Sequence, residues 1–81
     1  MPTVLRDGPY RFYFFSNDRN EPPHVHIDRD DLSAKFWLDP VGLAVNHGFN
    51  GRELLTIQSI VSKNQRQFLE DWNGHFGAIS G

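Results

Sequence analysis

The chain has 81 residues, no cysteine, 38% hydrophobic residues and a formal net charge of −2. This length fits one small domain, residues 1–81, and the lack of cysteine excludes disulfides and thiolate zinc sites and is typical of a reducing cytosol. The charge does not support binding of nucleic acid mainly through basic residues, and no segment approaches the ~20 apolar residues of a membrane span. We therefore expect a cytoplasmic protein with no membrane association.

The first half of the chain is predicted to form short strands. Four ranges rich in aromatic and β-branched residues stand between turn signals. These ranges are 3–6, 10–15, 24–29 and 34–38. Residues 41–45 follow Pro40, which disfavours helix at the residue before it. Apolar residues alternate over 41–45, so this range forms either a fifth strand or a single helical turn.

The second half is predicted to form one long helix over residues 52–75. Asn50 can cap its first turn, and Glu53 stands three residues later, where a carboxylate is favourable. Apolar residues recur at helical spacing along one stripe. They are Leu54, Ile57, Val61, Phe68, Leu69, Trp72 and Phe76. A straight helix of this length measures ~36 Å, so it either bends or leaves its C-terminal half, around Phe68, Trp72 and Phe76, free for self-association.

Strands followed by a helix predict an α+β fold, with a small antiparallel sheet of four to five strands packed on one long C-terminal helix. One helix covers one sheet face, and alternation assigns an apolar set to that inner face. The set is Phe12, Phe14, Val25, Ile27, Ala34, Phe36 and Leu38. The outer face then carries Arg11, Tyr13, Phe15, His24, His26, Asp28, Lys35 and Trp37. Exposed aromatic patches often mark interfaces, so we expect all of these except Arg11 to bind a partner.

The segment "NEPPHVHIDRDD" places His24, His26 and Asp28 on alternate positions directly after two prolines. Two imidazoles and a carboxylate are a recurrent metal-ligand set. In a straight strand, side chains two residues apart lie ~6.5–7 Å apart, so one ion that reaches both histidines hardly reaches Asp28 as well. We therefore predict no cofactor and no metal site, with His24 and His26 as the candidates if one exists.

The same residues permit acid–base chemistry on a phosphodiester, with His24 and His26 as the acid–base pair and Lys35 or Arg11 as the stabilising cation. That hypothesis requires a pocket in which a histidine lies within hydrogen-bond reach of one of these cations. A third interpretation is that the histidines are structural and satisfied by local hydrogen bonds. If they point outward, His24→Ala combined with His26→Ala should leave the fold intact.

The segments "MPTVLR", "YRFYFFSNDRNEPPHVHI", "AKFWLDPVGLAVNHGF" and "FLEDWNGHF" resemble a family of small uncharacterised bacterial proteins. The resemblance runs over almost the whole chain, and it implies a gene usually placed beside one for a second small uncharacterised protein. Such a pair suggests a toxin–antitoxin-like module, and the family brings no catalytic residues.

The preferred function is therefore a protein-interaction component of such a module. It would use the outer sheet face to bind the small protein encoded by the adjacent gene. An RNase-type toxin and a metal-binding regulator are the alternatives.

Overall fold

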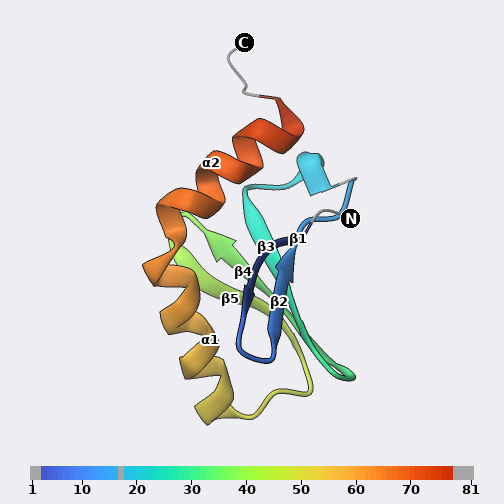
Figure 1. The fold of residues 1–81 in the computed structure, drawn as a ribbon, viewed down its shortest axis with the longest axis vertical. Coiled ribbons are helices and arrows are strands. Elements are labelled where there is room, and N and C mark those ends of the chain that lie inside the picture. The colour runs from blue at the N-terminus through green and yellow to red at the C-terminus, as the bar shows by residue number, and fades with distance from the viewer. Residues whose placement is uncertain (1–2, 17, 78–81) are drawn as a thin grey trace.

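The computed structural model describes residues 3–16 and 18–77, so residues 1–2, 17 and 78–81 of the expected domain lie outside it (Figure 1). The strands are β1 (Thr3–Asp7), β2 (Tyr10–Tyr13), β3 (His24–Arg29), β4 (Leu32–Leu38) and β5 (Val41–His47). A short 3-10 helix, η1 (Asp18–Asn20), precedes β3, and the helices α1 (Gly51–Lys63) and α2 (Gln65–Phe76) follow the sheet. The α+β fold class is confirmed, and residues 41–45 belong to a strand rather than to a helical turn.

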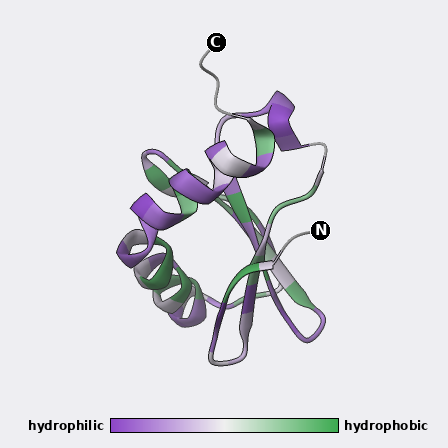
Figure 2. Ribbon diagram, turned by 45° about the horizontal axis from the view of Figure 1, so that its top comes forward, coloured by the Kyte–Doolittle hydropathy of each residue, from purple (hydrophilic) through white to green (hydrophobic). Residues whose placement is uncertain are grey.

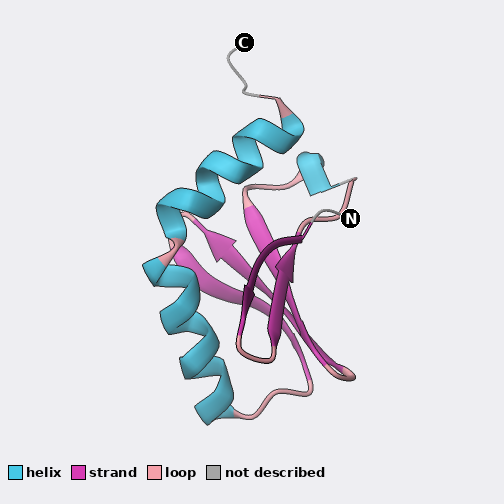
Figure 3. Ribbon diagram, viewed as in Figure 1, coloured by secondary structure: helices cyan, strands magenta, loops and turns pink. Residues whose placement is uncertain are grey.

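The five strands form one antiparallel sheet in the order β1-β2-β3-β4-β5, in which each strand pairs with its neighbours along the chain. Both helices run along one side of this sheet (Figure 3). Figure 2 shows hydrophobic residues of α1 on the side that faces the strands. None of the helices that the structure describes is long and apolar enough to cross a membrane.

The inner face of the sheet holds the core, as the alternation of the strands predicts. Val25 lies opposite Phe36 and Ile27 lies opposite Ala34 in the pairing of β3 with β4. All seven residues assigned to this face are buried in one cluster: Phe12, Phe14, Val25, Ile27, Ala34, Phe36 and Leu38. The helices complete the cluster with Ile57, Val61, Phe68 and Trp72. The assignment of the inner face is therefore correct.

Asn64 divides the expected helix 52–75 into α1 and α2, and the chain changes direction there (Figure 1). The Asn64 side chain donates a hydrogen bond of 2.8 Å to the Ile60 carbonyl, and its backbone N–H donates to the same oxygen. The next residue, Gln65, donates through its amide to the Leu38 carbonyl at the end of β4. These contacts end α1 and tie the start of α2 to the sheet.

The bend brings the apolar side chains of α2 into the core. Phe68 is 1% exposed and Trp72 is 7% exposed, so both side chains are buried within the core of this chain. Self-association through these two side chains would require them to leave the core. Of the expected alternatives for this helix, bending is the one that the fold adopts.

The first turn of α1 is fixed by a capping contact and by a bridge to the sheet. The Asn50 side chain accepts a hydrogen bond of 2.8 Å from the backbone N–H of Glu53, as expected. The Glu53 carboxylate in turn accepts from the Tyr10 hydroxyl at 2.8 Å and from two nitrogens of Arg29. One carboxylate thus joins α1 to β2 and β3, and bidentate pairing with arginine is the stronger class of ion pair.

Because of this bridge, we expect the free energy of unfolding to decrease as the pH becomes acidic. The hydrogen bond from Arg29 is the main cause that lowers the pKa of Glu53 from its ordinary value of 4.5. A carboxyl with a lowered folded-state pKa stabilises the fold above the unfolded-state pKa, and this contribution is lost as the pH falls through the folded-state pKa. We therefore expect Glu53→Gln to be less stable than the wild type at neutral pH, and the difference to shrink below about pH 4.5. Urea unfolding across this range tests it, and a constant difference between the two proteins contradicts it.

Candidate functional site

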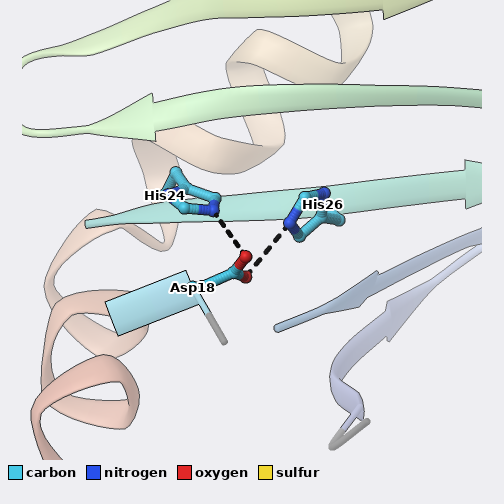
Figure 4. A group of neighbouring side chains, drawn as sticks. All are labelled: Asp18, His24 and His26. Atoms are coloured by element: carbon cyan, nitrogen blue, oxygen red, sulfur yellow. Dashed lines mark hydrogen bonds and ion pairs between the residues drawn. The ribbon is translucent and has the colours of Figure 1, made fainter. Parts of the chain in front are cut away.

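The first residues of β3 meet η1 beside the end of the sheet, where three polar side chains converge (Figure 4). Nε2 of His24 lies 3.2 Å from Oδ1 of Asp18, and Nε2 of His26 lies 3.1 Å from Oδ2 of the same carboxylate. One nitrogen of each histidine and one oxygen of Asp18 all lie within 4.8 Å of one another. The two predicted histidines thus meet at Asp18, which was not among the predicted site residues.

Backbone contacts of the loop hold Asp18 in place. Oδ2 of Asp18 accepts a hydrogen bond of 2.8 Å from the Phe15 N–H, and the Asp18 N–H donates to the Phe15 carbonyl at 3.2 Å. The Asp18 carbonyl accepts from the Glu21 N–H at 3.0 Å. Side-chain bonding to a nearby backbone amide is typical of aspartate in turns, and the polar run 16–23 carried this signal. The carboxylate is therefore oriented by the turn independently of the histidines.

His24 is fully buried, so its predicted exposure is wrong. Its ring lies between two indoles, with centroid distances of 5.7 Å to Trp37 and 5.1 Å to Trp72. The alternation of the strand does place His24 on the face opposite to Val25. However, His24 is the first residue of β3, and α2 continues past this end of the sheet (Figure 1). The side chain is covered from α2 by Trp72, and the outer face is not open at this position.

The ring nitrogens of His24 have different surroundings. Nδ1 lies 2.9 Å from the Pro22 carbonyl oxygen, which only accepts, so Nδ1 carries a proton. Nε2 is fully buried and, although close to Asp18, lacks a hydrogen-bond partner of acceptable geometry among the described residues. A buried nitrogen in this state needs an explanation.

His26 is partly buried among the aromatic residues of the outer face. Its ring stacks on Tyr13 at 5.4 Å and meets the edge of Phe15 at 4.5 Å. Burial is the main cause that lowers the pKa of His26, and the Asp18 carboxylate opposes this effect. The ring is thus held neutral at neutral pH, with Nε2 directed at Asp18.

Asp28, the third member of the predicted row, is engaged elsewhere. It accepts a hydrogen bond of 2.9 Å from the Tyr13 hydroxyl, and Tyr13 is buried rather than exposed. Burial, followed by this hydrogen bond, raises the pKa of Tyr13 to about 12, so the phenol stays a donor. The Arg11 guanidinium lies 4.5 Å above the Tyr13 ring and donates to Oγ1 of Thr3.

The predicted cation Lys35 is paired with a carboxylate. Its Nζ donates to Oε1 of Glu21 at 2.6 Å and lies 4.8 Å from the centre of the half-buried Trp37 ring. Within the described part of the chain, neither His24 nor His26 forms a hydrogen bond with Lys35 or with the other proposed cation. The contact that the nuclease hypothesis requires is therefore not formed there.

A pocket of about 290 Å³ lies on the outer face between β2 and β5. Its lining contains four predicted residues and four others: Tyr13, Phe15, His26, Lys35, Ser33, Ala34, Val45 and His47. Val45 reaches this face because β5 has a bulge, in which Lys35 pairs with Val45 but Phe36 pairs with Leu43. One extra residue, Ala44, reverses the alternation that the sequence suggested for 41–45.

A family model described as Domain of unknown function (DUF4160) matches residues 10–73, which is most of the chain. The chain belongs to the DUF4160 family. The expected membership in an uncharacterised domain family is thus confirmed, and the DUF4160 match includes Asp18, both histidines and all the residues that line the pocket. No curated protein and no solved structure matches the chain.

The outer side of this DUF4160 domain therefore presents two adjoining features. One is the cluster of Asp18, His24 and His26, whose three donor atoms suit a cation. The other is the aromatic pocket, which reaches the edge strand β5. His26 belongs to both the cluster and the pocket lining, so the two features are adjacent.

Proposed function

We propose that this DUF4160 domain is the protein-interaction component of a cytoplasmic, toxin–antitoxin-like two-gene bacterial module, and that it binds its partner through the outer sheet face. The observation that carries the proposal is the position of the aromatic pocket directly beside the edge of β5 that no other described strand pairs with. The partner is the small protein encoded by the adjacent gene, and the lack of cysteine fits a reducing compartment.

The edge of β5 suits the addition of a strand from another protein. Its one neighbour among the described strands is β4, and its sequence, VGLAVNH, contains no charged residue and no proline. Leu43 is 44% exposed and Val45 is 38% exposed. Natural sheets usually protect their edges with charges, proline or a covering segment, and an edge without charge or proline is a template for pairing.

The pocket gives this edge a means of selecting its partner. A strand added to β5 would lie ~4.8 Å away and would send alternate side chains to the outer face. Those side chains would lie beside Val45 and His47, which line the pocket. Main-chain pairing then supplies affinity, while an apolar or aromatic side chain that enters the pocket beside Val45 and His47 supplies specificity. We therefore propose an extended segment with such an anchor as the bound element.

Val45→Asp is expected to abolish binding of the adjacent gene product, because it places a charge in the wall of the pocket and beside the paired edge. Leu55→Asp is the matched control, since Leu55 is 68% exposed on α1 and does not line the pocket. Both changes are at exposed positions and should alter stability by about 0.5 kcal/mol or less. Co-purification with the neighbouring protein tests the proposal, with circular dichroism melting as the folding check. Equal binding by the two variants, or no complex with the wild type, contradicts it.

A further inference from the structure

We infer that Asp18, His24 and His26 form a binding site for a first-row divalent transition-metal ion such as Zn²⁺. The inference goes beyond the proposed interaction and does not depend on it. It also departs from the sequence-based expectation of no metal site, which considered Asp28 as the third ligand and omitted Asp18.

The donor set and its spacing suit such an ion. Two imidazole nitrogens and one carboxylate oxygen are a common ligand set for zinc and for iron(II), and they leave at least one coordination position open. In a tetrahedral zinc site with bonds of about 2.0–2.1 Å, donor atoms lie roughly 3.3–3.4 Å apart. The Asp18 carboxylate is 3.2 Å and 3.1 Å from the two histidine nitrogens, and all three donor atoms lie within 4.8 Å. The two short distances are to different oxygens of the carboxylate, so donor atoms that lie farther apart than this must move closer together when the ion binds.

The tautomer of His24 leaves room for a cation between its Nε2 and Asp18. Its Nδ1 donates to the Pro22 carbonyl, so in the neutral ring Nε2 presents a lone pair. That lone pair faces the Asp18 carboxylate oxygen at 3.2 Å. Two acceptors at this distance repel each other unless a proton or a metal ion lies between them. Nε2 is fully buried and, within the described residues, does not meet the geometry of a hydrogen bond, which favours the metal ion.

Neighbouring groups hold each ligand in an orientation that suits binding. The Pro22 carbonyl fixes the tautomer and the ring plane of His24, the Phe15 N–H fixes the Asp18 carboxylate, and Tyr13 stacks on His26. Such supporting hydrogen bonds to metal ligands orient them and raise affinity. The paired prolines before β3 restrict the backbone that carries the Pro22 carbonyl. The cluster is therefore preorganised from three separate directions.

Zinc titration of the full, tag-free chain after removal of metal with a chelator tests the inference. We expect one Zn²⁺ per chain by calorimetry and a higher thermal midpoint in its presence, because an ion that binds the folded state alone stabilises it. Asp18→Asn keeps the shape of the side chain but removes its charge, and it should weaken Zn²⁺ binding by roughly tenfold or more. Asp28→Asn is the matched control on the same face and should bind like the wild type.

A second comparison separates this site from adventitious binding to other histidines. The double variant His47→Gln with His75→Gln keeps the cluster intact and should retain the wild-type affinity for Zn²⁺. The inference is overturned if Asp18→Asn binds as tightly as the wild type, or if the affinity is lost in the double variant. It is also overturned if the folded wild type neither binds Zn²⁺ nor melts at a higher temperature with it.

Discussion

Truncation of Phe36 to alanine is expected to lower the free energy of unfolding by ~3–5 kcal/mol. The Phe36 side chain is fully buried at the centre of β4, and it lies opposite Val25 in the pairing with β3. It belongs to the same core cluster as Trp72 of α2. Its removal leaves a cavity between sheet and helices that the surrounding side chains fill only in part. Urea unfolding followed by circular dichroism measures the loss.

The matched control is Leu43→Ala, on the neighbouring strand. Leu43 is the register partner of Phe36 in β5, yet it is 44% exposed. Its truncation removes little buried surface and should cost less than about 1 kcal/mol. A similar loss for both variants, or a loss below about 1 kcal/mol for Phe36→Ala, would mean that the inner face does not hold the core.

The strands and the inner face could be predicted because they depend on local pattern. Val25 and Ile27 alternate with histidines over a single strand, and the partner strand repeats the pattern with Ala34 and Phe36. A side-chain period of two assigns faces without knowledge of any other part of the chain. Each strand also pairs with its neighbour along the chain, so the order of the sheet needs no distant information.

Two features of the fold fall outside such patterns. The bulge at Ala44 adds one residue to β5 and reverses the faces beyond it, and no turn residue marks that position. The break at Asn64 interrupts a continuous apolar stripe. Side-chain hydrogen bonds compete there with those of the helical backbone. The Asn64 side chain donates to the Ile60 carbonyl, and the Gln65 side chain donates to the Leu38 carbonyl. The length of the stripe left bending and a free C-terminal half as alternatives, and it could not locate a bend.

Two of the three residues of the candidate cluster were selected from the sequence, because the three residues come from two elements. His24 and His26 stand out as a pair on one strand, whereas Asp18 is one of several acidic residues nearby. Its proximity depends on η1 folding back over β3, whereas the alternation of a strand groups only residues of that strand, such as His24, His26 and Asp28. The burial of His24 depends on Trp72, which is far along the chain and reaches it because the chain changes direction at Asn64, between α1 and α2. The residue pattern of one strand predicts neither the approach of Asp18 nor the contact of Trp72 with His24.

This burial reverses the expected effect of replacing the first histidine. We expect His24→Ala to lower the free energy of unfolding by roughly 2–4 kcal/mol, comparable with other large-to-small changes in a core. The change empties the space between the rings of Trp37 and Trp72 and deprives the Pro22 carbonyl of its hydrogen bond. His26→Ala should cost only about 1 kcal/mol, because His26 retains some exposure and stacks on the outer face.

The comparison is made by urea unfolding at neutral pH with a chelator present, so that loss of a bound metal does not add to the effect of packing. Under these conditions the difference between the two variants reports on ring packing and on the hydrogen bonds of each ring, without a contribution from metal. If His24→Ala is as stable as the wild type, the ring does not support the contact of α2 with the end of β3. If both variants lose the same amount, the two rings contribute equally, and the distinction drawn from the buried position of His24 is wrong. A larger loss for His24→Ala shows that this histidine stabilises the core through its ring.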